Sequence, residues 1–86
     1  MTSGLKLRIV TPDEVFYEGE VEYVQAPGAM GSLGILKDHA PLVTALTDGK
    51  LTVRDMEKQV NTYNIQNGFL EVLDNRVLVL SERVDR

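Results

Sequence analysis

The single histidine of this chain, His39, directly follows Asp38 and lies seven residues after Ser32. Serine, histidine and a carboxylate are the groups of a nucleophilic hydrolase, but a catalytic triad requires them to converge in space beside an oxyanion hole. Nearness in the sequence supplies neither condition. We therefore expect His39 to be a polar turn residue that caps the backbone or meets a partner. A small hydrolase built on Asp38 and His39 is a separate hypothesis, which turnover lost in His39→Ala would favour.

Three glycines at a spacing of three, Gly28, Gly31 and Gly34, form a second candidate site. A phosphate-binding loop requires Gly-Lys-Ser/Thr at the start of a helix, and a dinucleotide fingerprint requires G-x-G-x-x-G between a strand and a helix. Extended segments flank these glycines, and no lysine follows at the required place. The pattern predicts a tight turn between strands, with an exposed loop free for binding, and no cofactor.

Acidic side chains gather in residues 13–22, but their spacing is not that of a calcium loop. The chain has no cysteine and one histidine, which is too few nitrogen and sulfur ligands for a zinc site. Its net charge of −4 argues against nucleic acid as a partner. The acidic stretch is either a solvated edge or a patch that faces a basic partner, and we expect no metal.

The composition predicts one soluble, intracellular domain that spans residues 1–86 and is a monomer when isolated. A hydrophobic content of 43% is sufficient for a globular core. No apolar run approaches the roughly 20 residues of a membrane-spanning helix, and the N-terminus lacks the apolar core of a signal peptide.

Short segments of alternating apolar and polar residues predict β-strands separated by turns. Leu5, Leu7 and Ile9 alternate with basic residues, and Thr11-Pro12-Asp13 ends that strand because proline cannot donate to a ladder. Reversals are expected at Pro27-Gly28, Asp48-Gly49, 55–58, Asn67-Gly68 and Asp74-Asn75. The predicted strands are 5–9, 15–17, 21–23, 33–36, 41–46, 51–53, 60–66, 69–73 and 76–80. No helix is expected, and the pattern favours an antiparallel sandwich or flattened barrel.

Residues 26–47 read APGAMGSLGILKDHAPLVTALT. This run resembles the signature PG-x-x-G-x-LGIL-x-x-HAPL-x-T-x-L of the epsilon subunit of F-type ATP synthase, in its N-terminal β-sandwich domain. The opening LRIVTPDEVFYEGEVEYVQAPG and the closing NTYNIQNGFLEVLDNRVLVLSE are also similar to that family, so the resemblance covers residues 5–82.

The resemblance implies a ten-stranded sandwich of two five-stranded sheets. It also implies a non-catalytic subunit of the rotor, which links the gamma subunit to the ring of c subunits and couples ion translocation to ATP synthesis. Such a protein lies at the cytoplasmic face of a bacterial inner membrane, as a peripheral part of the complex. The family places the loop of Ala29, Met30, Gly31 and Ser32 on the c ring. It places Thr11, His39, Ala40, Pro41, Leu42 and Thr44 on the gamma subunit.

Two departures from the family pattern matter. Most members continue into a C-terminal helical hairpin, which inhibits ATP hydrolysis and in some members binds ATP, whereas this sequence stops where that hairpin would begin. We expect neither function of this chain. Ser32 stands where many members carry an acid that docks on the c ring, so its contact would rest on hydrogen bonding alone. The alternative to a rotor subunit is a stand-alone β-sandwich module that binds a peptide or small ligand.

Overall fold

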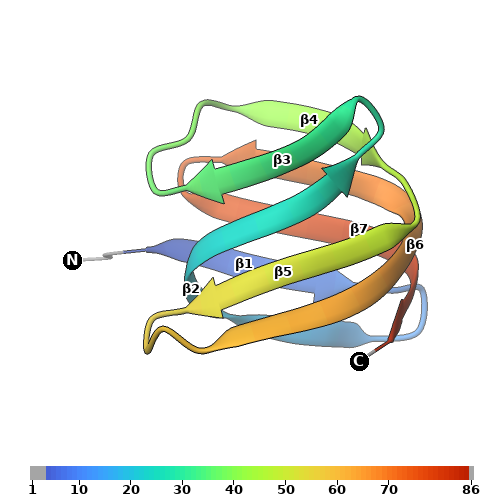
Figure 1. The fold of residues 1–86 in the computed structure, drawn as a ribbon, viewed down its shortest axis with the longest axis horizontal. Coiled ribbons are helices and arrows are strands. Elements are labelled where there is room, and N and C mark those ends of the chain that lie inside the picture. The colour runs from blue at the N-terminus through green and yellow to red at the C-terminus, as the bar shows by residue number, and fades with distance from the viewer. Residues whose placement is uncertain (1–3, 86) are drawn as a thin grey trace.

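The computed structural model describes residues 4–85, which form seven β-strands and no helix (Figure 1). The all-β sandwich predicted from the sequence is confirmed, whereas the number of separate strands is smaller than the ten expected. Strands predicted separately at 15–17 and 21–23, and at 60–66 and 69–73, are continuous. The strands are β1 (Leu5–Val10), β2 (Val15–Gly28), β3 (Gly31–Leu36), β4 (Leu42–Leu46), β5 (Gly49–Asp55), β6 (Val60–Leu73) and β7 (Arg76–Asp85).

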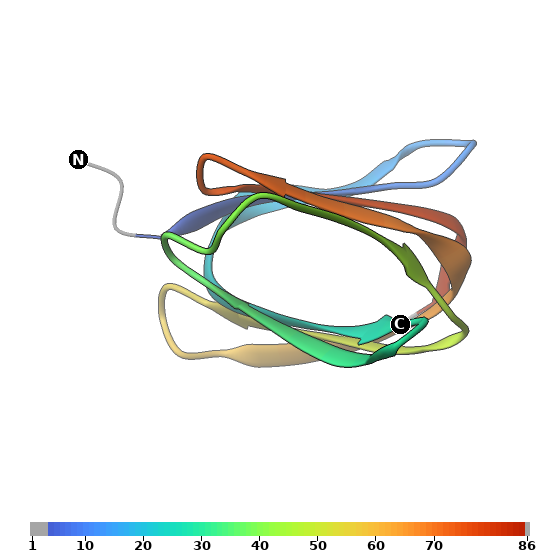
Figure 2. The same ribbon diagram turned by 90° about the horizontal axis from the view of Figure 1, so that it is seen from above.

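The long strands bend from one layer of the sandwich into the other (Figure 2). The first half of β2 pairs with β1, and its second half pairs with β3 and β5. Likewise the first part of β6 pairs with β5 and its second part pairs with β4. Strand β7 pairs with β6 between Asn64 and Leu73. Because β2, β6 and β7 each enter both layers, seven strands supply the five segments per layer that the family resemblance implies.

One pair of strands departs from the antiparallel arrangement predicted from the sequence. Strand β1 runs parallel to β7, with Leu7 opposite Val77 and Ile9 opposite Val79. Both strands start from the same end of the molecule, where the amide of Lys6 donates to the carbonyl of Asn75 at 2.9 Å. This parallel pairing, together with the β1–β2 ladder, closes the sheet on itself.

The core lies between the two layers and is built from alternate residues of every strand. Leu5, Leu7 and Ile9 are buried, as their alternation predicted, and Leu51 and Val53 of β5 are buried in the same core cluster. The remaining buried apolar side chains are Val21, Val24, Ala26, Ile35, Leu46, Ile65, Leu70, Val72, Val77 and Val79.

Several predicted turns are confirmed. Thr11 closes the β1–β2 turn, where its hydroxyl accepts from the amides of Asp13 and Glu14 at 3.3 Å. The β5–β6 turn is held by the carboxylate of Asp55, which accepts from two amides further along the chain. Asp74 and Asn75 join β6 to β7 with φ values of +48° and +62°, as a tight hairpin with both central residues left-handed requires.

The hairpins predicted at Asp48-Gly49 and Asn67-Gly68 are wrong, because the chain does not reverse at either place. Strands β4 and β5 run in the same direction along β6 in one unbroken register. Both dipeptides are instead corners at which the chain passes from one layer to the other. The two corners are joined, since the amide of Asn67 donates to Asp48 Oδ1 at 3.0 Å. Residues that permit a positive φ serve a bend as readily as a reversal.

Candidate partner-binding surfaces

The loop predicted to face a ring of subunits projects from the end of the β2–β3 hairpin (Figure 1). Met30 at its tip is 97% exposed. Gly31 has a φ of +131°, a conformation that a residue with a Cβ rarely adopts. The base of the loop is fixed, because the amide of Ala29 donates to the carbonyl of Ala45 at 3.0 Å. Gln25 Nε2 donates to the hydroxyl of Ser32 at 3.0 Å, so a rigid sheet presents an exposed apolar tip.

The second predicted segment, His39 to Leu42, lies at the opposite end of β3 from Ser32. His39 Nδ1 is 2.7 Å from the carbonyl oxygen of Ala40, and the amide of His39 donates to the carbonyl of Leu36 at 3.2 Å. His39 is therefore the polar turn residue expected from the sequence. Because the length of β3 separates His39 from Ser32, the two side chains cannot act on one substrate atom. Ser32 therefore cannot be the nucleophile of a hydrolase built on Asp38 and His39.

The residues predicted to contact a gamma subunit do not form one cluster. Thr11 lies at the end of the molecule that carries the Asn67–Gly68 corner, whereas His39 lies beside the β6–β7 hairpin at the other end. In β4, Leu42 packs against the core and Thr44 is half-buried on the same side of the strand. Ala40 and Pro41 are exposed.

Sequence reasoning missed the exposed residues that lie between these two ends. Val43, Phe69 and Leu80 are 68%, 57% and 42% exposed, and they project from the outer surface of β4, β6 and β7. Phe69 lies directly opposite Ala45 in β4 and Leu80 in β7. We call Val43, Ala45, Phe69 and Leu80 the apolar face. The alternation in β4 contained the signal, since Leu42, Thr44 and Leu46 point inward and leave Val43 and Ala45 outside.

A groove connects the apolar face to the β1–β2 turn. It has a volume of about 470 Å³, and Val10, Thr11, Phe69 and Leu80 are among the residues that line it. Thr11 therefore adjoins the apolar face, although it lies far from His39. The predicted residues at the two ends of the molecule are linked by an apolar surface that the predictions did not include.

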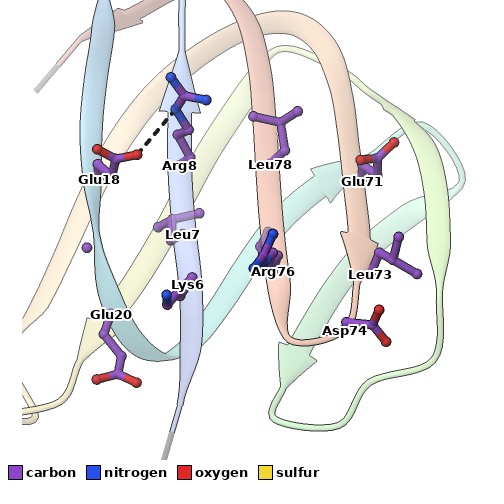
Figure 3. A pocket seen from close by; sticks show the side chains of 12 residues that line it. Lys6, Leu7, Arg8, Glu18, Glu20, Glu71, Leu73, Asp74, Arg76 and Leu78 are labelled. Carbon is purple, nitrogen blue, oxygen red and sulfur yellow. Dashed lines mark ion pairs between the residues drawn. The ribbon is translucent and has the colours of Figure 1, made fainter. Parts of the chain in front are cut away.

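Toward the other end of β1 the same outer surface is charged (Figure 3). A shallow depression of about 1060 Å³ there is lined by side chains of both signs. Arg8 Nε pairs with Glu18 at 3.4 Å, but Lys6 and Arg76, which are opposite each other in the β1–β7 register, have no ion pair within residues 4–85. Lys6 is also opposite Glu20 in the β1–β2 register, and Glu71 and Asp74 line the same depression, so its charges are of both signs.

A further charged group holds the β5–β6 turn against β2. The carboxylate of Glu22 accepts from Lys58 Nζ at 2.8 Å and from Arg54 Nε at 2.5 Å. The Arg54 guanidinium in turn lies 5.2 Å from the ring centroid of Tyr23. Hydrogen bonding by Lys58, and then by Arg54, lowers the pKa of Glu22 below its usual value.

This lowered pKa predicts a pH-dependent contribution to stability. Because folded Glu22 holds its proton less tightly than the unfolded chain, the contribution is complete above the usual pKa near 4.5 and is lost as the pH falls through the lowered value. Glu22→Gln should therefore be less stable than the unmodified chain at pH 7, and the difference should vanish in acid. Urea unfolding of both chains between pH 7 and pH 3 measures it. A difference that stays constant with pH would show that the ion pairs are not its source.

Within residues 4–85 no group of three or more His, Cys, Asp or Glu side chains is arranged to hold a metal ion. No helix in the same range is long and apolar enough to cross a membrane.

Comparison with known proteins identifies the family of this chain. Residues 4–86 match the family described as "ATP synthase, Delta/Epsilon chain, beta-sandwich domain". The chain is 44% identical to an ATP synthase epsilon chain of Desulforamulus reducens over 86 residues, which are all of this chain and 64% of that protein. It is also 44% identical to an ATP synthase epsilon chain of Chlorobium limicola, with 94% of this chain and 92% of that one covered.

A solved structure has the same fold. A chain of the Euglena gracilis mitochondrial ATP synthase superposes with a TM-score of 0.91 at 24% identity, covering 95% of this chain and 52% of its own length. With the family match, which spans almost the whole sequence, this likeness confirms the resemblance seen in residues 26–47. The chain belongs to the family of ATP synthase delta/epsilon chains, of which it carries the β-sandwich domain.

Proposed function

We propose that this chain is a non-catalytic part of the ATP synthase rotor, which links the gamma subunit to the c ring and so couples ion translocation to ATP synthesis. In this proposal residues 1–86 act as one domain with no cofactor. It works at the cytoplasmic face of a bacterial inner membrane as a peripheral member of the complex. Membership of the family supports the assignment to ATP synthase, and the surfaces described above support the two contacts.

The observation that carries the proposal is the apolar face on a rigid sandwich. Three large apolar side chains, Val43, Phe69 and Leu80, stand exposed on neighbouring strands of one layer. Contiguous apolar surface of this kind marks a site of protein–protein contact. Thr11 borders this face through the groove, so we assign the face, with Thr11 and the segment from His39 to Leu42, to the gamma subunit. Thr44 then supports the contact from the inner side of β4.

The proposed c-ring contact is the loop from Ala29 to Ser32. Met30 supplies an apolar tip, and Ser32 supplies a hydroxyl close to it. Met30 is 97% exposed at the tip of the loop, so in this proposal it contacts a second partner while the apolar face is occupied. A close-packed core resists deformation, which suits an element that transmits torque between the two contacts.

Ser32→Lys tests the loop. A lysine there places a charge in a partly desolvated contact, which costs about 1–3 kcal/mol where it finds no partner. ATP-driven ion pumping by the reassembled enzyme should fall, while the melting temperature of the isolated chain should hold because the loop is exposed. Met30→Ala is the apolar counterpart. If both variants assemble and pump like the unmodified chain, the loop is not the ring contact.

A stand-alone module that binds a peptide or small ligand is the competing function. Co-purification separates the two: a rotor subunit binds a gamma subunit through the apolar face, whereas a ligand-binding module does not.

A further inference from the structure

We infer that Asn75 is a positioning residue, which holds the segment from Asp38 to Leu42 in the shape that meets the gamma subunit. The inference rests on the proposed function, and it concerns a residue outside the segment itself. Its basis is a pair of reciprocal hydrogen bonds between two turns that are 37 residues apart in the sequence.

The two turns are joined by both atoms of one side-chain amide. The amide of Asp38 donates to Asn75 Oδ1 at 2.6 Å, and Asn75 Nδ2 donates to Asp38 Oδ1 at 3.1 Å. We call this pair the 38–75 clamp. Since the carbonyl of Asn75 also accepts from Lys6 at the start of β1, the clamp fixes the segment to the two paired strands β1 and β7.

The clamp acts at a turn that lies outside the strand ladders. Asp38 has a φ of +67°, in the left-handed region that residues other than glycine seldom occupy. After the half-buried His39, Ala40 and Pro41 are exposed and make no ladder. A loop that lies outside the strand ladders must lose conformational freedom when it binds a partner. By fixing its first residue, Asn75 removes part of that loss before the partner arrives, and preorganisation of this kind raises affinity.

Asparagine at position 75 satisfies two requirements at once. The tight β6–β7 turn requires a positive φ there, which asparagine and glycine both adopt readily. Glycine would satisfy the turn alone, since it has no side chain to reach Asp38. The structure therefore provides a substitution, Asn75→Gly, that retains the hairpin and removes the clamp. At the other turn Asp38→Gly also permits the left-handed backbone and removes the carboxylate, whereas Asp38→Asn retains an acceptor oxygen.

The first measurement uses the isolated chain. Amide hydrogen exchange at Asp38 should accelerate in Asn75→Gly, because its N–H loses the Oδ1 acceptor, while amides in the core of β6 and β7 keep their protection. An unchanged Asp38 amide would overturn the inference whatever the partner is. A collapse of protection throughout β6 and β7 would mean that the residue serves the fold, which also overturns it.

The second measurement is the affinity of the chain for the gamma subunit of the same enzyme. We expect Asn75→Gly and Asp38→Gly each to raise Kd about three- to tenfold, the effect of about one hydrogen bond. Asp38→Gly removes only the bond to the carboxylate, since the backbone amide of residue 38 still donates to Asn75, so the double variant should bind no more weakly than Asn75→Gly. Asp38→Asn should bind like the unmodified chain. Losses that add in the double variant would mean that each residue touches the partner by itself, and the positioning role would be wrong.

The failures of this inference and of the proposed function give different results. If the unmodified chain does not bind the gamma subunit, the proposed function is wrong and the inference falls with it. If the unmodified chain binds and both glycine variants bind equally well, the proposed function stands and the 38–75 clamp has no part in it.

Discussion

Gly68→Ala is expected to unfold the domain or to destabilise it by about 3 kcal/mol or more, which for a domain of this size lowers the melting temperature by roughly 12–24 °C. Gly68 lies at the corner of β6, where a Cβ would overlap the carbonyl group of Leu80 and approach the Cα of Ser81 to 3.0 Å. Both obstacles are backbone atoms of β7, so relief requires separating two paired strands.

Gly19→Ala is the matched control, because Gly19 also lies within a long strand that crosses the layers. Its added Cβ would lie 3.0 Å from the hydroxyl oxygen of Tyr17, the far end of a side chain that can rotate away. We expect a change below about 1 kcal/mol for this variant. Thermal unfolding followed by circular dichroism compares the two. Equal melting temperatures would mean that the β6 and β7 strands separate at the corner without cost.

The strand β1 and the corner at Asn67-Gly68 show what the sequence can and cannot predict. The period of two in Leu5, Leu7 and Ile9 identified a buried strand face, and every one of these side chains is in the core. Such alternation depends on local geometry alone. The meaning of Asn67-Gly68 depends on which strand lies beside it, and so a signal typical of a hairpin proved to be a corner.

The candidate surfaces also divide into parts that local sequence predicts and parts that depend on strand pairing. The resemblance in residues 26–47 drew attention to the loop at Met30 and the segment at His39, and both are exposed turns as glycine and proline content predicted. Phe69 and Leu80 escaped notice because an apolar residue in a strand is ordinarily assigned to the core. Only the pairing of β6 with β4 and β7 shows that they share an outer surface.

The 38–75 clamp could not be predicted, because it joins a loop and a hairpin through side-chain atoms. Asn75 was predicted only as part of a reversal, and Asp38 was considered only as the acid beside His39, whereas both have a positive φ in their own turns. No pattern in the sequence indicates that these two residues meet. Hydrogen bonds between distant turns depend on how the two layers of the sandwich pack together.

Phe69→Glu is expected to weaken binding of the gamma subunit about a hundredfold or more, equivalent to about 3 kcal/mol, while folding is almost unchanged. Phe69 is 57% exposed in the isolated chain and lies in the middle of the apolar face, opposite Ala45 and Leu80. A carboxylate there keeps its water in the free protein. In the complex it would lose that water and replace an aromatic contact with an unpaired charge, and a buried charge without a partner carries its full desolvation penalty.

Val60→Glu provides the control, because Val60 is 60% exposed at the other end of the same strand and pairs with β5 in the second layer. It adds the same charge to the same strand, away from the apolar face. Titration of the gamma subunit with each variant measures Kd, and urea unfolding confirms that both remain folded. If Phe69→Glu binds as tightly as Val60→Glu, the apolar face is not the gamma contact. A loss in both variants would instead trace the effect to net charge, because the two substitutions change that charge equally and only Phe69 lies on the proposed interface.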